Sequence, residues 1–335
     1  MARTTPERPV DIEEVIPELS GYRRLGTRLH PRPGAPRPDQ SSVGGPFLWP
    51  ADEPWPMCTE PHKRRFGERL SDVRLRRRIL AEAWSRRPGP GQSEGPTDEE
   101  FEILRSLRRG RHAPWLADTD PIPLMPVAQL YTRDVPGLSL PGDADLLQVF
   151  WCPFNAHGEE RNVAVHMYWR KTSDISAVLA EQPELEVVGR EEYVPAPCVL
   201  HPEQITEHQW GDLLPFSIRA RLDEWEDWED EDEDAVSYQF DLSVPPGWKV
   251  GGYAPWPLTG PQEMVCGCGQ QMELLLTIDG REWDKGTRSW VPLEDRDVAD
   301  TEANTPTQIV VGRGGRLMVF VCSSDWSHPH RVVLQ

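Results

Sequence analysis

The pattern of apolar and polar residues predicts short β-strands over most of the chain. Three runs rich in β-branched and aromatic residues cover positions 123–135, 145–154 and 162–171, with Pro, Gly and Asp between them. Past residue 240, an apolar run MELLLTID occupies 272–279 and a further run GRLMVFVC occupies 315–322. The 35 prolines disfavour long helices, which fits short strands joined by many turns.

Helices are expected in an insertion before residue 112 and in the segments around TSDISAVLAEQ, at 172–182, and around the acidic tract. Between residues 63 and 87, Phe66, Leu70, Val73, Leu80, Ala83 and Trp84 share one helical face, and Thr97 can cap a second helix with an acidic first turn. We interpret residues 60–112 as a helical insertion. Further helix is expected in the segment TEHQWGDLLPFSIRARLDEWEDW, which runs into the acidic tract at 223–234.

Two short motifs recur along the chain. VGGPFLWP at 43–50 is echoed by VGGYAPWP at 250–257, and LLQVFWC at 146–152 is echoed by RLMVFVC at 316–322. Cys58 follows Gly44 by 14 residues, and Cys266 follows Gly251 by 15. This ordered set predicts an internal duplication, with two sheets related by a pseudo-twofold axis and a groove between them as a candidate binding site.

The duplication divides the chain into four parts. We expect an N-terminal arm at 1–42 that packs onto the body, a first copy at 43–200 that contains the helical insertion, a helical and acidic connector at 201–240, and a second copy at 241–335.

The glycine pairs of the echo do not form a phosphate-binding loop, because the Gly-Lys-Ser/Thr ending and the strand-to-helix context are missing. Paired glycines supply positive φ angles or allow close packing of a ring. We therefore expect a structural role for the marks of the repeat, which are Gly44, Gly45, Trp49, Gly251, Gly252 and Trp256.

Charge limits the class of partner. The formal net charge is −19 and the pI is near 4.9, which favours a basic protein partner and makes nucleic acid and anionic membranes unfavourable ones. The chain shows no secretory pattern and no run of about 18 apolar residues, so we expect a cytoplasmic protein without a membrane span.

The six cysteines suggest thiols or metal ligands in a reducing compartment. Cys266 and Cys268 could bind zinc together with Cys322 and with His328 or His330. The alternative is that Cys266 and Cys322, like Cys58 and Cys152, are small buried residues on neighbouring strands. We favour this alternative, because only the second copy shows additional ligands nearby. No cofactor is therefore expected, and zinc is the metal to consider.

The acidic tract carries the most distinctive polar chemistry. Trp225 and Trp228 lie three residues apart, on one side of a helix. Either they dock this helix onto the body while the acids face water, or the segment captures a basic protein. The partner-binding candidates are Trp225, Trp228, Glu229, Asp230, Glu231 and Asp232.

No recognisable catalytic frame accompanies the cysteines and histidines. His157, His166, His201 and His208 lie in the same stretch as Cys152 and Cys198, but without a nucleophile elbow. The sequence therefore gives no support to an enzyme and assigns no catalytic residue.

The chain resembles the YwqG-like family of bacterial domains of unknown function. The resemblance rests on GGPFLWPADEPWPMC, PVAQLYTRDVPG, GGYAPWP, CGCGQQMELLLTIDG and the closing strand that ends in Val-Cys. The set is also distantly similar to the programmed cell death protein 2 family, whose members are thought of as chaperones for a basic ribosomal protein.

The resemblance implies an α+β fold that is mainly antiparallel and duplicated, with no established enzymatic activity. It implies nothing about the helical insertion in the first copy, which we expect to belong to a subgroup of the family. We expect a non-enzymatic protein-binding module, chaperone-like or immunity-like, that recognises a basic protein. The alternative is an enzyme or a small-ligand sensor that uses the groove between the two copies.

Overall fold

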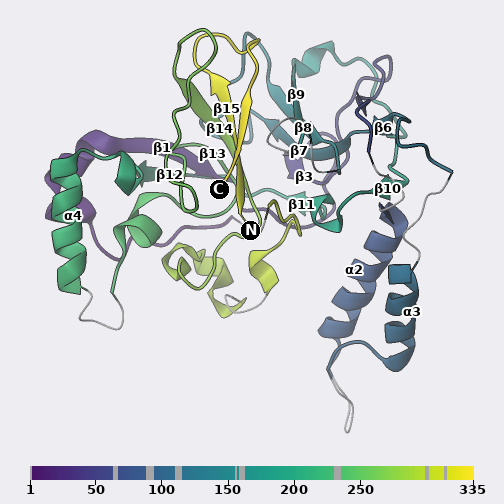
Figure 1. Ribbon diagram of the computed structural model, residues 1–335, viewed down its shortest axis with the longest axis horizontal. Coiled ribbons are helices and arrows are strands. Elements are labelled where there is room, and N and C mark those ends of the chain that lie inside the picture. Colours follow the sequence, from purple (N-terminus) through teal and green to yellow (C-terminus); the bar gives the residue numbers. More distant parts are fainter. Residues whose placement is uncertain are drawn as a thin grey trace.

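The computed structural model describes residues 2–62, 67–87, 94–109, 115–154, 157, 163–229, 235–298, 302–312 and 315–335. It confirms an α+β fold built on antiparallel sheets, with helices at its margins (Figure 1). Two six-stranded sheets form the body, and two pairs of short strands flank them.

The first sheet, called sheet I here, has the spatial order β2 (Arg32–Pro33), β11 (Cys198–Val199), β3 (Ser42–Val43), β7 (Met125–Tyr131), β8 (Leu146–Trp151) and β9 (Val165–Arg170). Sheet II has the order β12 (Glu203–His208), β1 (Arg23–Arg28), β13 (Lys249–Gly251), β14 (Met272–Asp279), β15 (Arg316–Cys322) and β16 (Arg331–Leu334). The short pairs are β4 (Met57–Cys58) with β6 (Ile122–Pro123), and β5 (Glu68–Arg69) with β10 (Val187–Val188).

The helices lie outside both sheets. They are α1 (Ile12–Val15), α2 (Leu70–Ser85), α3 (Asp98–Arg109) and α4 (Phe216–Glu229). A π-helical turn covers Tyr238–Ser243. Short 3-10 helices occur at Pro17–Tyr22, Thr172–Asp174, Glu191–Tyr193, Gly211–Leu213, Arg288–Trp290, Leu293–Val298 and Glu302–Asn304.

Each sheet contains an inner strand that comes from a part of the chain distant from most of its other strands. β1 and β2 are consecutive, yet β1 lies between β12 and β13 in sheet II while β2 borders sheet I. Likewise β11 lies between β2 and β3 in sheet I, whereas the following strand, β12, borders sheet II. The segment assigned to an N-terminal arm therefore contains an inner strand, and the connector contains β12.

The backbone register follows the repeat read from the sequence. Phe150 lies opposite Pro126 and Val149 opposite Ala128, and Phe320 lies opposite Leu274 and Val319 opposite Leu276. Both ladders skip one residue at this step, which marks a β-bulge at the same position of each sheet. The duplication stays a prediction, and this common register supports it.

A third recurrence appears once the exchanged strands are known. Leu29-His30-Pro31 follows β1, and Leu200-His201-Pro202 follows β11. The two segments touch, because the His201 backbone N–H donates to the Leu29 carbonyl at 2.9 Å. The sequence reasoning missed this pair, since neither flanking strand has a long apolar run.

The glycines of the echo have the backbone conformations that their structural role requires. Gly44 and Gly251 have φ angles of 64° and 63°, and Gly252 has a φ of 68°. A Cβ on Gly45 would lie 2.5 Å from Pro36 Cγ, so close packing excludes a side chain there as well.

The tryptophans of the echo are buried. Trp49 has no exposed surface, and its ring lies 5.4 Å from Trp55, 5.3 Å from Phe150 and 5.1 Å from Tyr168. Trp256 is 4% exposed and stacks on Phe320. Both side chains therefore contribute to the core.

One hydrophobic core joins the two sheets. It contains Val127, Leu147 and Val149 from sheet I together with Leu276 and Val319 from sheet II. A second cluster around Trp256 and Phe320 covers the other face of sheet II. A third connects the residues of α1 with those of α4.

The helical insertion projects from sheet I, on the opposite side of the molecule from α4 (Figure 1). Leu70 and Val73 of α2 enter the core, and the Arg77 guanidinium donates to the carbonyls of Val194 and Glu191, both at 2.7 Å. The apolar face differs from the expected one, because Trp84 is 62% exposed while the Arg76 stem is buried beside Glu68. Phe66 lies outside the described residues.

Among the described residues, no helix combines the length and the apolar character needed to cross a lipid bilayer.

We predict that Trp256→Ala lowers the free energy of unfolding by about 3 kcal/mol, because it leaves a cavity beside Phe320. Chemical denaturation measures this value. Trp84→Ala is the matched control, and its exposed ring predicts a change within about 0.5 kcal/mol. Equal stability of the two variants would contradict a structural role for the echo.

Candidate metal centres

A cluster of two cysteines and two histidines lies at the end of sheet I. Cys58 ends β4, Cys152 follows β8, and His62 and His157 come from the adjoining loops. All four side chains are buried, and their ligand atoms lie within 4.8 Å of one another. We call this set the first tetrad.

The atoms of the first tetrad converge on one point. His62 Nε2 lies 3.4 Å from Cys58 Sγ, 3.4 Å from Cys152 Sγ and 3.2 Å from His157 Nε2. Cys58 Sγ lies 3.5 Å from His157 Nε2. Thiolate and imidazole are ligands for zinc and related divalent ions.

Neighbouring groups orient the first tetrad. The His62 ring stacks on Phe154 with ring centroids 5.0 Å apart, and the His62 backbone N–H donates to the Asp118 carbonyl at 2.8 Å. The hydrogen bond with Cys152 is the main cause that lowers the pKa of the Cys58 thiol, and the two histidines assist against the effect of burial. The thiolate that a metal requires is therefore favoured at Cys58.

A second tetrad lies at the corresponding end of sheet II. It consists of Cys266, Cys268, Cys322 and His328. Cys322 ends β15, as Cys152 follows β8 in sheet I. Cys266 Sγ lies 3.5 Å from His328 Nδ1, and Cys268 Sγ lies 3.6 Å from Cys322 Sγ.

A tight turn brings Cys266 and Cys268 together despite the single intervening residue. Val265 and Gln271 form an isolated bridge, the Cys266 N–H donates to the Gln270 carbonyl at 2.8 Å, and Gly269 has a φ of 84°. Backbone N–H groups of such turns point towards the sulfurs of many metal sites.

Asp325 supports His328 from outside this tetrad. His328 presents Nδ1 to Cys266, and its Nε2 lies 3.6 Å from the Asp325 carboxylate. Metal-bound histidines commonly place their other nitrogen near a carboxylate. The hydrogen bond with His328 is the largest cause that lowers the pKa of the Cys322 thiol to about 6.

The structure brings together the four candidate ligands predicted for the second copy, while His330 instead faces the Val165 carbonyl at 3.1 Å. The interpretation of Cys58 and Cys152 was wrong in one respect. They are buried, as expected, but the first copy also has ligands nearby, because loops that the strand pattern does not describe carry His62 and His157 to them.

A signal for the first tetrad was present in the sequence. His62 follows Cys58 by four positions, and His157 follows Cys152 by five, which are spacings typical of zinc ligand pairs. Each pair lies in a different part of the chain, so the two had to be combined to be recognised.

The partner-binding candidates are described only in part. Trp225 is half-buried and packs against the cluster that joins α1 to α4, which agrees with a docking role. The side chains of Trp228 and Glu229, and residues 230–234 with Asp230, Glu231 and Asp232, lie outside the described residues. Their role in binding stays a prediction.

Comparison of the chain with models of known protein families and with curated proteins finds no match. Membership of the YwqG-like family therefore stays a prediction.

We predict two equivalents of bound transition metal per chain, measured by inductively coupled plasma mass spectrometry. Cys152→Ser should remove the metal of the first tetrad and Cys322→Ser that of the second, each leaving about one equivalent. Cys198→Ser is the control, because Cys198 is buried but belongs to neither tetrad. Full metal content in either tetrad variant would contradict the assignment.

Proposed function

We propose that this chain is a non-enzymatic, zinc-stabilised binding protein for a basic protein partner. The observation that carries the proposal is that each tetrad presents four protein ligands to one point. A zinc site with four protein ligands is structural, whereas a catalytic zinc site keeps a position for water or substrate. The metals then stabilise the fold, and the protein surface binds the partner.

The spacing of the ligand atoms supports zinc. Tetrahedral bonds of zinc length place sulfur and nitrogen about 3.6 Å apart, two nitrogens about 3.3 Å apart and two sulfurs about 3.8 Å apart. The sulfur–nitrogen distances here are 3.4–3.5 Å. The nitrogen pair is 3.2 Å apart and the sulfur pair 3.6 Å apart.

Burial sets the two centres apart. The first tetrad is wholly buried, which closes it to substrate. In the second, Cys268 is exposed and His328 half-buried, so its metal is closer to solvent. The second centre therefore exchanges its metal faster than the first.

The basic character of the partner is inferred from the negative net charge of the chain. With 55 acidic against 36 basic residues, the chain attracts a basic protein over a long range, and the interaction is weakened by salt. Chaperone-like protection of a basic protein and immunity-like neutralisation of a basic toxin both fit this chemistry. All six cysteines are free thiols, which agrees with the cytoplasmic location that we propose.

The alternative, an enzyme or small-ligand sensor in the groove between the copies, has less support. Side chains of both sheets share one core, which fills the centre of that interface. At the margin of the interface, one hollow between β9 and the loop at 326–330 is lined by Tyr168, Trp326 and His330, and another is lined by Gly137, Ser139 and Val250.

The test is affinity capture by the full zinc-loaded chain at low and at high salt, followed by titration of each captured protein in purified form. We predict capture of proteins of high pI that is lost at high salt, because screening weakens charge attraction. Mass spectrometry identifies them. Capture of no protein at low salt would overturn the proposal.

A matched pair of variants tests the acidic tract. Neutralising residues 229–234 to Gln and Asn should weaken binding of the captured protein by at least about tenfold, if these acids make the contact. The control neutralises six exposed acids elsewhere, which are Glu14, Glu181, Asp212, Glu263, Glu273 and Asp297. Equal losses would mean that net charge alone attracts the partner.

A further inference from the structure

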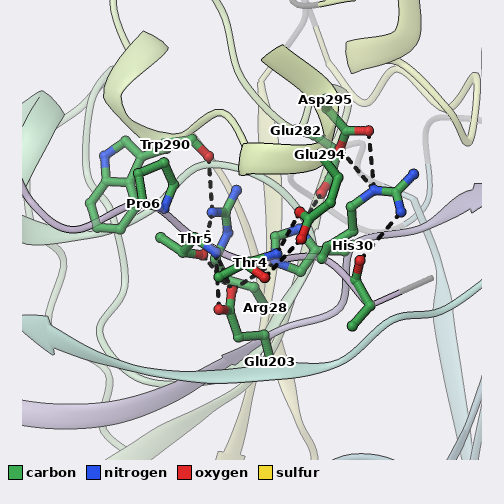
Figure 2. A network of polar contacts seen from close by, with 12 residues as sticks. Thr4, Thr5, Pro6, Arg28, His30, Glu203, Glu282, Trp290, Glu294 and Asp295 are labelled. Carbon is green, nitrogen blue, oxygen red and sulfur yellow. Dashed lines mark hydrogen bonds and ion pairs between the residues drawn. The ribbon is translucent and has the colours of Figure 1, made fainter. Parts of the chain in front are cut away.

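Residues 2–9 lie in an extended conformation across the ends of β1 and β12 and against the helical turns at 288–298. Arg3, Thr5, Pro6 and Arg8 are half-buried, while Ala2, Thr4, Glu7 and Pro9 are exposed. The exposure alternates as in a β-strand from Ala2 to Thr5, and the phase shifts at Pro6. We call residues 2–9 the leading segment (Figure 2).

Carboxylates hold the backbone of the leading segment. The Thr4 N–H donates to Glu294 Oε2 at 2.8 Å, and the Thr5 N–H donates to both oxygens of Glu203 at 2.9 Å (Figure 2). The Leu293 N–H donates to the Thr4 carbonyl at 2.9 Å. These contacts recognise an extended backbone and do not depend on the identity of its side chains.

Two pockets accept arginine side chains. The Arg3 Nε donates to Asp295 at 3.0 and 3.1 Å. The Arg8 guanidinium lies 3.5 Å above the Trp290 ring and donates to the Asp241 and Ser289 carbonyls, both at 3.0 Å. A carboxylate fork and an aromatic face with carbonyl acceptors are the partners that suit a guanidinium.

The floor of the groove is charged, although it is buried. Arg28, His30 and Glu282 are buried, and Arg28 Nη1 donates to Thr5 Oγ1 at 2.8 Å and to the Trp290 carbonyl at 3.0 Å. Arg28 Nε and Nη2 and Glu282 Oε2 have no hydrogen-bond partner among the described residues. Buried charges reduce stability unless they are well paired, and they gather at functional sites.

The leading segment is held by polar contacts and by the stacking of Arg8 on Trp290. None of residues 2–9 is buried, and the apolar packing against the cluster that joins α1 to α4 begins at Val10. The segment can therefore leave the groove without opening the core that joins α1 to α4. A competitor must only exceed the effective concentration of a tethered peptide, which is of millimolar order.

We propose that the groove formed by Glu203, Asp241, Trp290, Glu294 and Asp295 binds an extended, arginine-containing segment of the partner protein, and that the leading segment is its displaceable occupant. This inference rests on the proposed function and deepens it. It names the site on the chain and the chemistry of the partner, which is two arginines about five residues apart on an extended backbone. The leading segment thereby limits binding to partners that compete with it.

The experiment compares the full chain with a chain that lacks residues 2–9. The probe is a fluorescent peptide with the sequence of residues 2–9, Ala-Arg-Thr-Thr-Pro-Glu-Arg-Pro, titrated by anisotropy. We expect saturable binding to the shortened chain and at least about tenfold weaker binding to the full chain, where the tethered segment competes. A scrambled peptide of the same composition, and one with both arginines replaced by Gln, should each bind at least about tenfold more weakly.

Matched variants locate the site. In the shortened chain, Asp295→Asn should weaken the peptide at least about tenfold, whereas Asp297→Asn, which alters an exposed acid two residues away, should not. If the shortened chain is unfolded by circular dichroism, the full chain with Arg3→Gln and Arg8→Gln replaces it, and it should bind the peptide more tightly than the wild type does.

Two results would overturn the inference: peptide binding that neither shortening nor the arginine variants improve, and equal binding of the scrambled peptide. The proposed function fails separately. A captured basic protein that binds the full chain, the shortened chain and the Asp295→Asn variant equally would overturn the groove alone. Peptide binding without capture of any basic protein would overturn the proposed function alone.

Discussion

The fold depends on the backbone pairing of β1, a strand near the start of the chain, with strands far along it. β1 pairs with β12 through six residue pairs and with β13 through three, so it is an inner strand of sheet II. An inner strand carries hydrogen bonds on both edges, and unpaired backbone groups are costly in a buried sheet. Because β11 enters sheet I in the same way, the two sheets are interlocked by the chain itself, and the shared core follows from that.

Strands whose buried residues are mainly apolar could be predicted from the sequence. Strands whose buried residues include polar or charged side chains could not. β8 and β15 have almost no exposed positions, and their apolar runs predicted both strands. β1 reads RRLGTR and β12 reads EQITEH, so no apolar pattern marks them. Their inner positions hold Arg28 and Glu207, and Glu207 pairs with the equally buried Lys249. Burial raises the pKa of Glu207 and lowers that of Lys249. A fully buried pair of ionisable residues is unusual in a strand, so the sequence pattern does not predict it.

The candidate sites were predictable to the extent that their residues are close in sequence. The second tetrad has two ligands in one turn and two near the last long strand, and all four were named as candidates. The first tetrad combines Cys58 and His62 with Cys152 and His157, about ninety residues apart, and the pairing of β4 with β6 and of β7 with β8 brings them together. The groove of the leading segment combines Glu203, Asp241 and the stretch 290–295, which lie far apart in the chain, so no local motif could have indicated it.

The position of the first tetrad connects it to the helices α2 and α3. Cys58 and His62 precede α2 in the chain, and the His62 N–H donates to the carbonyl of Asp118, which follows α3. The segment that leads into α2 and the segment that follows α3 therefore meet at the first tetrad. Cys152, which follows the long strand β8, contacts His62 there. The metal proposed for this tetrad would hold the chain together at the base of the helical pair, and Leu70, Val73 and Arg77 of α2 contact the body independently of it.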